Sequence, residues 1–133
     1  MEIIIRYIMI SMGRPKKKIL AIDDEAPMLA LLKRLLEPED YDVITTQSGK
    51  EGLAICEREA IDLLLLDIDM SEMSGLDVLI RLRERHPLMP VIMLTASQNE
   101  VVALTAMRLG AFDYIMKPFN IDQFKLTIKA KLL

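Results

Sequence analysis

Short apolar runs alternate with amphipathic stretches from Lys17 onward, and this alternation limits the possible folds more than any other feature of the sequence. The apolar runs are rich in leucine and β-branched residues, as is typical of strands. They cover residues 18–22, 41–45, 61–66, 91–94 and 113–116. A helical stretch after every strand indicates a parallel sheet with helices on both faces. We therefore expect a doubly wound α/β domain with five parallel strands and five helices.

The third run, residues 61–66, is expected to form the central strand. It reads Ile-Asp-Leu-Leu-Leu-Leu, and a nearly continuous apolar run is typical of a strand that is covered on both faces. Asp67 follows this run directly. We therefore expect Asp67 at the carboxyl end of a buried strand.

Polar residues mark where the helices begin. Ser48, Ser74 and Ser97 are each followed three residues later by an acidic residue, a pattern that indicates a helix start. Asn120 precedes the last helical stretch and is expected to cap it. The helical stretch that follows Glu25 is expected to end at Pro38.

The composition fits one folded domain. The chain has 133 residues, of which 52% are hydrophobic and 28% charged, and this excludes a disordered protein. A net charge of -3 gives no reason to expect direct nucleic-acid binding by the domain. Cys56 has no second cysteine to pair with, so we expect a buried free thiol and a reducing, cytoplasmic setting.

Residues 1–16 are expected to be an N-terminal extension of undefined role, and residues 17–133 the folded domain. The stretch from Ile3 to Ile10 is apolar except for Arg6, but it is too short to span a membrane and lacks the features of a signal peptide. We expect no membrane association. Three interpretations of the segment stay open: Met12 is the true start, or the segment adds a strand, or it forms an association surface.

Reactive side chains follow four of the expected strands. They are Asp23, Asp24 and Glu25 after the first strand, Asp67 and Asp69 after the third, Thr95 after the fourth and Lys117 after the fifth. Ligands of open parallel sheets bind at the carboxyl ends of the strands, where these residues should meet. Two carboxylates about 4 Å apart repel by about 4 kcal/mol at an effective dielectric near 20, so a cation must offset their charge.

Oxygen ligands of this kind suit Mg²⁺, which completes its coordination shell with water and substrate phosphate. Phosphoryl transfer requires an in-line nucleophile, a metal ion, a further cation and hydrogen-bond donors. Asp67, Mg²⁺, Lys117 and Thr95 would fill these roles. An aspartate nucleophile forms an aspartyl phosphate that is later hydrolysed, and this chemistry provides a timed switch.

Taken in order, these motifs resemble those of the receiver domain of bacterial response regulators, from about Lys17 to the end of the chain. The resemblance rests on Ile22-Asp-Asp-Glu25, Leu65-Leu-Asp-Ile-Asp-Met70 with Met73 and Gly75, Leu94-Thr-Ala96, Gly110-Ala-Phe-Asp-Tyr114 and Lys117-Pro-Phe119. It implies a flavodoxin-like fold with strand order 2-1-3-4-5. It also implies a two-component phosphorelay, in which the phosphohistidine of a sensor histidine kinase or a phosphotransfer protein supplies the phosphate.

The resemblance also assigns the phosphoacceptor and the metal ligands. Asp67 would accept the phosphate. Asp24 would bind Mg²⁺ directly and Asp23 through water, together with Asp67 and the backbone carbonyl of Asp69. Mn²⁺ can substitute for Mg²⁺ in such a site.

Two further residues would form the switch. Thr95 and Lys117 would each contact a phosphoryl oxygen, and Tyr114 would change rotamer as Thr95 moves. The Lys117-Pro118 peptide is expected to be cis. In this family the fourth helix, fifth strand and fifth helix commonly form the surface for homodimers or for an output domain, and the apolar helix after Asn99 is consistent with that use.

The chain departs from the family pattern at two positions. Ser71 stands where proline is common, and a small loss of loop rigidity is expected there. Asp69 places an acid where a neutral side chain is more usual. That acid could help to hold Mg²⁺ or could repel the phosphoryl group, and we expect altered kinetics with intact chemistry.

Two other functions compete with the signalling switch. Asp67-Ile-Asp69 also resembles the nucleophile motif of haloacid-dehalogenase-type phosphatases, but those enzymes place the nucleophile before the acidic pair, whereas Asp23 and Asp24 come first here. A degenerate receiver that only binds partners is the third option, but such domains typically lack an acid or the lysine. We therefore expect a signalling switch and no enzyme acting on a separate substrate.

Overall fold

The computed structural model describes residues 1–11, 15–96 and 98–133. Five parallel strands form one sheet in the order β2-β1-β3-β4-β5. They are β1 (Lys17–Ile22), β2 (Tyr41–Thr46), β3 (Leu63–Asp67), β4 (Val91–Thr95) and β5 (Asp113–Met116). The predicted fold class and strand order 2-1-3-4-5 are confirmed.

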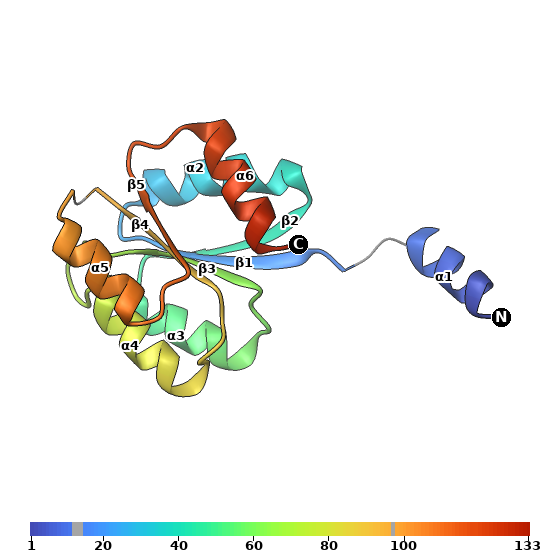
Figure 1. Cartoon of the computed structure of the whole chain (residues 1–133), viewed down its shortest axis with the longest axis horizontal. Coiled ribbons are helices and arrows are strands. Elements are labelled where there is room, and N and C mark those ends of the chain that lie inside the picture. Colours follow the sequence, from blue (N-terminus) through green and yellow to red (C-terminus); the bar gives the residue numbers. More distant parts are fainter. Residues whose placement is uncertain (12–14, 97) are drawn as a thin grey trace.

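Helices cover both faces of the sheet. They are α2 (Ala26–Leu36), α3 (Gly49–Arg58), α4 (Gly75–Arg85), α5 (Glu100–Arg108) and α6 (Ile121–Lys131), and a further helix, α1 (Glu2–Ser11), precedes the sheet. Figure 1 shows α2 and α6 on one face and α3, α4 and α5 on the other. The five predicted helices are therefore present, and α1 is a sixth α-helix among the residues that the structure describes.

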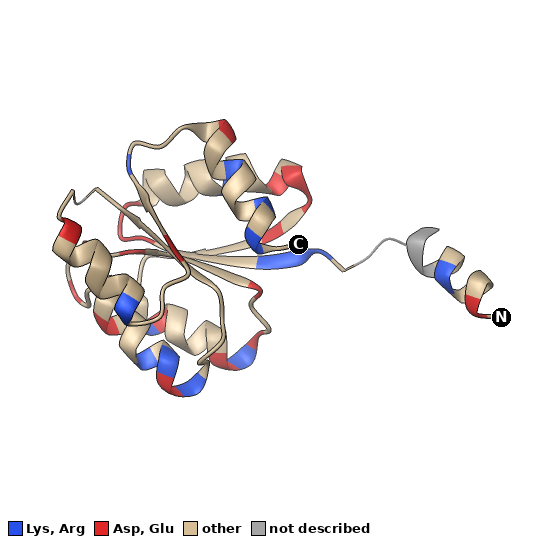
Figure 2. Cartoon of the chain, in the orientation of Figure 1, with Lys and Arg blue, Asp and Glu red and all other residues tan. Residues whose placement is uncertain are grey.

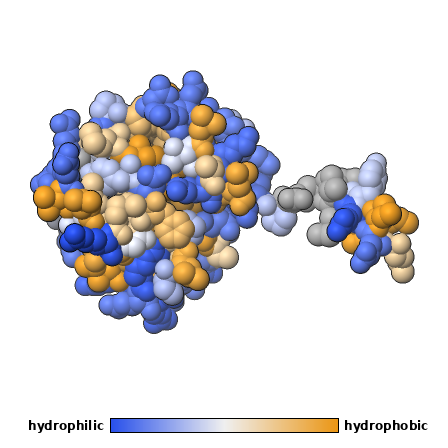
Figure 3. Space-filling model, viewed as in Figure 1, coloured by the Kyte–Doolittle hydropathy of each residue, from blue (hydrophilic) through white to orange (hydrophobic). Residues whose placement is uncertain are grey.

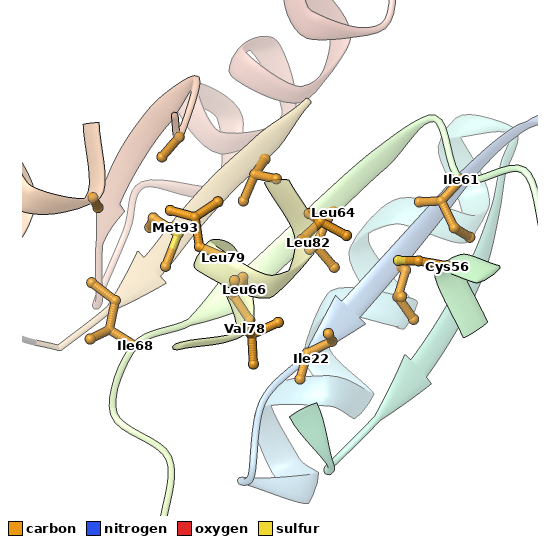
Figure 4. Close-up of a cluster of buried hydrophobic side chains, with 14 of the residues drawn as sticks. Ile22, Cys56, Ile61, Leu64, Leu66, Ile68, Val78, Leu79, Leu82 and Met93 are labelled. Atoms are coloured by element: carbon orange, nitrogen blue, oxygen red, sulfur yellow. The ribbon is translucent and has the colours of Figure 1, made fainter. Parts of the chain in front are cut away.

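Side chains of the central strand alternate between two hydrophobic layers. Leu64 and Leu66 pack with α3, α4 and α5, whereas Leu63 and Leu65 pack with α2 and α6. All four leucines are buried, as the continuous apolar run predicts. Figure 4 shows the first of these layers, with Leu79 and Leu82 of α4 close to Leu64 and Leu66.

The predicted bounds of the third strand need a correction. The strand begins at Leu63, two residues later than expected, and it includes Asp67 as its last residue. Asp62 lies just before the strand, where its carboxylate accepts a hydrogen bond from the backbone N–H of Lys18 at 2.7 Å and its own N–H donates to the Lys18 carbonyl at 2.9 Å. Because Asp67 belongs to β3 and pairs with Leu94 of β4, the sheet holds its backbone in place.

Three of the four predicted helix caps are present. Ser48, Ser74 and Asn120 each accept a hydrogen bond from the backbone N–H three residues further on. Ser97 lies outside the described residues, and the N-cap of α5 is Asn99, whose side chain accepts from the N–H of Val101. Pro38 lies in a short 3-10 helix, η1 (Glu37–Glu39), that follows α2 directly.

The N-terminal segment is helical, so the interpretation of this segment as an added strand is wrong. Figure 1 shows α1 apart from the sheet and the helices that cover it. Ile3, Ile4 and Ile5 of α1 are exposed. Within the part of the chain that the structure describes, none of the helices has the length and apolar character needed to cross a membrane.

Candidate functional site

The carboxyl ends of neighbouring strands bring three polar side chains into the protein interior. Asp23 directly follows β1, Asp67 ends β3 and Thr95 ends β4, and these residues are only 1%, 3% and 0% exposed. The order β1-β3-β4 in the sheet places the three strand ends side by side. Figure 2 shows the acidic turn after β1 in red at this edge. The predicted convergence of the strand-end residues is confirmed.

Lys117 brings a positive charge to the two buried carboxylates. Its Nζ donates to Asp23 Oδ2 at 2.6 Å and lies 3.7 Å from Asp67 Oδ1. The backbone N–H of Lys117 also donates to the carbonyl of Thr95 at 2.8 Å. This bond holds the backbone of Lys117 beside the end of β4. The Lys117-Pro118 peptide is cis, as the resemblance implies.

Burial raises the pKa of the Asp67 carboxyl to about 6. This value already includes smaller increases from the charges of Asp23 and Asp69, and decreases from Lys117 and from a hydrogen bond donated by the backbone N–H of Asp69. Desolvation therefore raises the pKa of Asp67 more than the Lys117 ammonium group lowers it. Additional positive charge at the site would favour the ionised, nucleophilic form of Asp67.

The turn after β1 holds an acidic cluster. Carboxylate oxygens of Asp23, Asp24 and Glu25 lie within 4.8 Å of one another. Asp23 Oδ1 also accepts from the backbone N–H of Glu25 at 2.9 Å, which closes the turn. This all-oxygen donor set and the buried charge beside it fit Mg²⁺. Glu25 adjoins Asp24 in the same acidic motif, but the sequence pattern alone did not indicate a metal-binding role for it.

The two departures from the family pattern both make hydrogen bonds at the site. The backbone N–H of Ser71 donates to Asp24 Oδ2 at 3.1 Å, a bond that proline could not form. The hydroxyl of Thr95 donates to Asp69 Oδ2 at 2.9 Å. The side chain of Asp69 is thus directed to Thr95, a contact that the sequence did not reveal.

Tyr114 of β5 adjoins Thr95. Burial and the charge of Asp69 raise the pKa of the Tyr114 hydroxyl, whereas its interaction with the Thr95 side chain lowers it. Tyr114 is half-buried against the layer formed with α3, α4 and α5. Asp69, Thr95 and Tyr114 therefore form one chain of contacts that leads away from Asp67.

Gly75, the first residue of α4, allows the loop after β3 to approach the site closely. A Cβ atom at this position would lie 2.1 Å from the carbonyl oxygen of Asp67, so no larger residue fits without movement of the backbone. The N–H of Gly75 donates to the carbonyl of Ile68 at 2.9 Å. Gly75 therefore helps to set the position of Asp67.

The chain is similar in sequence to bacterial transcriptional regulators. The chain is 44% identical over 115 residues to the transcriptional regulatory protein CpxR of Escherichia coli, and the match covers 86% of this chain and 49% of CpxR. It is 40% identical over 116 residues to the alkaline phosphatase synthesis transcriptional regulatory protein PhoP of Bacillus subtilis, with 87% of this chain and 48% of PhoP covered. The chain thus spans about half the length of these relatives.

Solved structures show the same fold. A CheY-like response regulator receiver domain protein from Methanospirillum hungatei superposes with a TM-score of 0.85 at 36% identity, over 89% of this chain and 94% of that one. The family model of the response regulator receiver domain matches residues 19–129. These comparisons do not support the phosphatase alternative. From β1 to α6, this chain belongs to the response regulator receiver domain family.

Proposed function

We propose that residues 17–133 are a receiver domain in which Asp67 accepts the phosphoryl group from the phosphohistidine of a sensor histidine kinase or phosphotransfer protein. The observation that carries this assignment is the buried pairing of Asp67 with Lys117, at the edge where Asp23 and Thr95 also meet. Residues 1–16, which precede the sheet, are an N-terminal extension to which we assign no role. The proposed setting is cytoplasmic.

In the proposed transfer, a carboxylate oxygen of Asp67 attacks phosphorus as the bond from phosphorus to the histidine nitrogen breaks. Lys117 Nζ lies 3.7 Å from Asp67 Oδ1 and would pair with a phosphoryl oxygen. Its positive charge would offset the negative charge of the phosphoryl group during transfer. Thr95, at the end of the adjacent strand, would donate its hydroxyl to another phosphoryl oxygen. The same groups would later permit hydrolysis of the aspartyl phosphate, without any separate substrate.

The acidic turn would hold the metal ion. Asp24 would bind Mg²⁺ directly, Asp23 through water, and Asp67 and the backbone carbonyl of Asp69 would complete the protein ligands. When bound, Mg²⁺ or Mn²⁺ would offset the charge of the carboxylates and of the phosphoryl oxygens. Asp23 also stabilises this turn, because its Oδ1 accepts a hydrogen bond from the Glu25 N–H.

The surface of α5, β5 and α6 would carry the signal outward. Its exposed apolar side chains are Val101, Leu104 and Met107 of α5, Met116 of β5 and Ile121 of α6. Figure 3 shows hydrophobic groups on this side of the molecule. Such exposed apolar groups indicate a contact surface, and we assign it to a homodimer or to an output partner. Tyr114 lies on β5, so a change of its rotamer would alter this surface.

Beryllofluoride, a phosphoryl mimic, tests the proposal. In the presence of Mg²⁺ it should shift the NMR signals of Thr95 and Tyr114 in the wild-type protein. Asp67→Asn is the matched control, because the amide keeps the shape of the side chain but removes the nucleophile. Absence of a shift in the wild type would defeat the proposed function.

The acid at position 69 should alter how long the aspartyl phosphate lasts. Asp69 lies next to the phosphoryl position and would repel the added charge, so we expect Asp69→Asn to change the dephosphorylation half-life while phosphorylation itself continues. Loss of radiolabelled phosphate over time measures this half-life. Equal half-lives in Asp69→Asn and the wild type would refute the expectation.

A further inference from the structure

The side chain and backbone of Asp69 contact two different parts of the candidate site. Its backbone N–H donates to Asp67 Oδ1 at 3.3 Å, and its carboxylate accepts from the Thr95 hydroxyl at 2.9 Å. Thr95 is fully buried, whereas Asp69 is exposed on the loop after β3. An exposed acid thus holds the hydroxyl of a buried residue at the end of the neighbouring strand.

The Thr95 hydroxyl has a single proton to donate. In the proposed function this proton is donated to a phosphoryl oxygen, but in the structure it is donated to Asp69. One proton cannot serve both acceptors with full strength. A phosphoryl group also brings up to about two negative charges close to the carboxylate of Asp69, and these charges repel it. In the proposed function, a phosphoryl group on Asp67 would therefore compete with Asp69 for the Thr95 proton.

The consequence reaches Tyr114. The Thr95 and Tyr114 side chains interact, and Tyr114 packs against the layer that contains Met93 of β4 and Ala106 of α5. A Thr95 side chain that is held by Asp69 keeps its partner Tyr114 in the present position. Release of Thr95 from Asp69 would change the contacts of Tyr114 on β5.

We propose that Asp69 is a positioning residue that holds Thr95, and through it Tyr114, in the resting arrangement until a phosphoryl group on Asp67 displaces the Asp69 carboxylate. This inference rests on the proposed function. It assigns a specific role to an acid that departs from the usual family pattern.

Variants at position 69 separate the hydrogen bond from the charge. Asp69→Ala removes the acceptor, so the Tyr114 signals of the unphosphorylated protein should move toward those of the beryllofluoride complex. Beryllofluoride should also bind about 3- to 10-fold more tightly, since the hydrogen bond from Thr95 to Asp69 no longer has to be broken, and a typical hydrogen bond contributes a net stabilisation of that size. Asp69→Asn keeps an oxygen acceptor and should have a smaller effect than Asp69→Ala on both measurements.

Two controls test whether the effect runs through Thr95. Glu72→Ala removes an exposed acid from the same loop and should leave Tyr114 and beryllofluoride affinity unchanged. In a Thr95→Val background, which lacks the hydroxyl, Asp69→Ala should no longer shift Tyr114. The double-mutant cycle isolates the interaction between the two residues.

Three results would overturn the proposal: no change in Asp69→Ala, equal effects of Asp69→Asn and Asp69→Ala, or an undiminished effect in the Thr95→Val background. Failure of the proposed function has a different signature. In that case the wild type would bind no beryllofluoride, while the Tyr114 signals of unliganded Asp69→Ala would still report whether Asp69 holds Thr95.

Discussion

Replacement of Asp67 by asparagine should stabilise the metal-free protein at neutral pH. The pKa of Asp67 is raised from 3.8 to about 6, mainly by burial, so the folded state binds a proton at this carboxyl more tightly than the unfolded state does. The stability from this group is fully present below pH 3.8 and is lost as the pH rises through about 6. At pH 7.5 the ionised carboxyl therefore costs about 3 kcal/mol, at 1.36 kcal/mol per pKa unit.

Urea unfolding followed by circular dichroism, with a chelator present, measures the effect. Asp67→Asn should raise the free energy of unfolding by up to about 3 kcal/mol at pH 7.5, and the gain should shrink below about 1 kcal/mol at pH 4. The matched control is Asp42→Asn, an exposed aspartate on β2, which should change stability by less than about 0.5 kcal/mol at both pH values. No gain at pH 7.5, or the same gain at both pH values, would refute the reasoning.

Three further predictions concern charge, packing and association. Lys117→Met removes the ammonium group beside Asp23 and Asp67. It should lower the free energy of unfolding at pH 7.5 by about 3 kcal/mol in urea titrations, and an unchanged free energy would contradict this prediction. Gly75→Ala forces a Cβ atom against the Asp67 carbonyl. It should lower the free energy of unfolding by more than about 2 kcal/mol in urea titrations and weaken beryllofluoride binding. Wild-type stability together with wild-type binding would exclude this clash. For the proposed homodimer, beryllofluoride should induce dimers of the wild type in sedimentation experiments. Leu104→Lys places a charge on the exposed face of α5 and should abolish these dimers without loss of fold, whereas dimers that persist would assign the interface elsewhere.

The sequence was sufficient to predict the sheet and the residues that meet at its edge. The apolar runs give five parallel strands, and parallel strands place Asp23, Asp67, Thr95 and Lys117 at one end whatever the details of the loops. Strand bounds were less accurate, because the Asp62 carboxylate, rather than a backbone carbonyl, accepts the hydrogen bond from the Lys18 N–H, and periodicity does not reveal such a side-chain contact.

The contacts of the loop residues could not be predicted. The carboxylate of Asp69 reaches Thr95, and the N–H of Ser71 reaches Asp24, only because the loop after β3 takes one particular course. That course depends on close packing at Gly75, which the sequence pattern does not define. The helical state of α1 was also missed, since an apolar segment of this length is compatible with a strand or a helix.

The central claim is that Asp67 carries the phosphoryl group. Incubation of the protein with Mg²⁺ and acetyl phosphate, followed by intact mass spectrometry and peptide mapping, tests it directly. The wild type should gain the mass of one phosphoryl group, located at Asp67, and Asp67→Asn should gain none. An unmodified wild type, or a phosphoryl group that maps to another residue or persists in Asp67→Asn, would contradict the account.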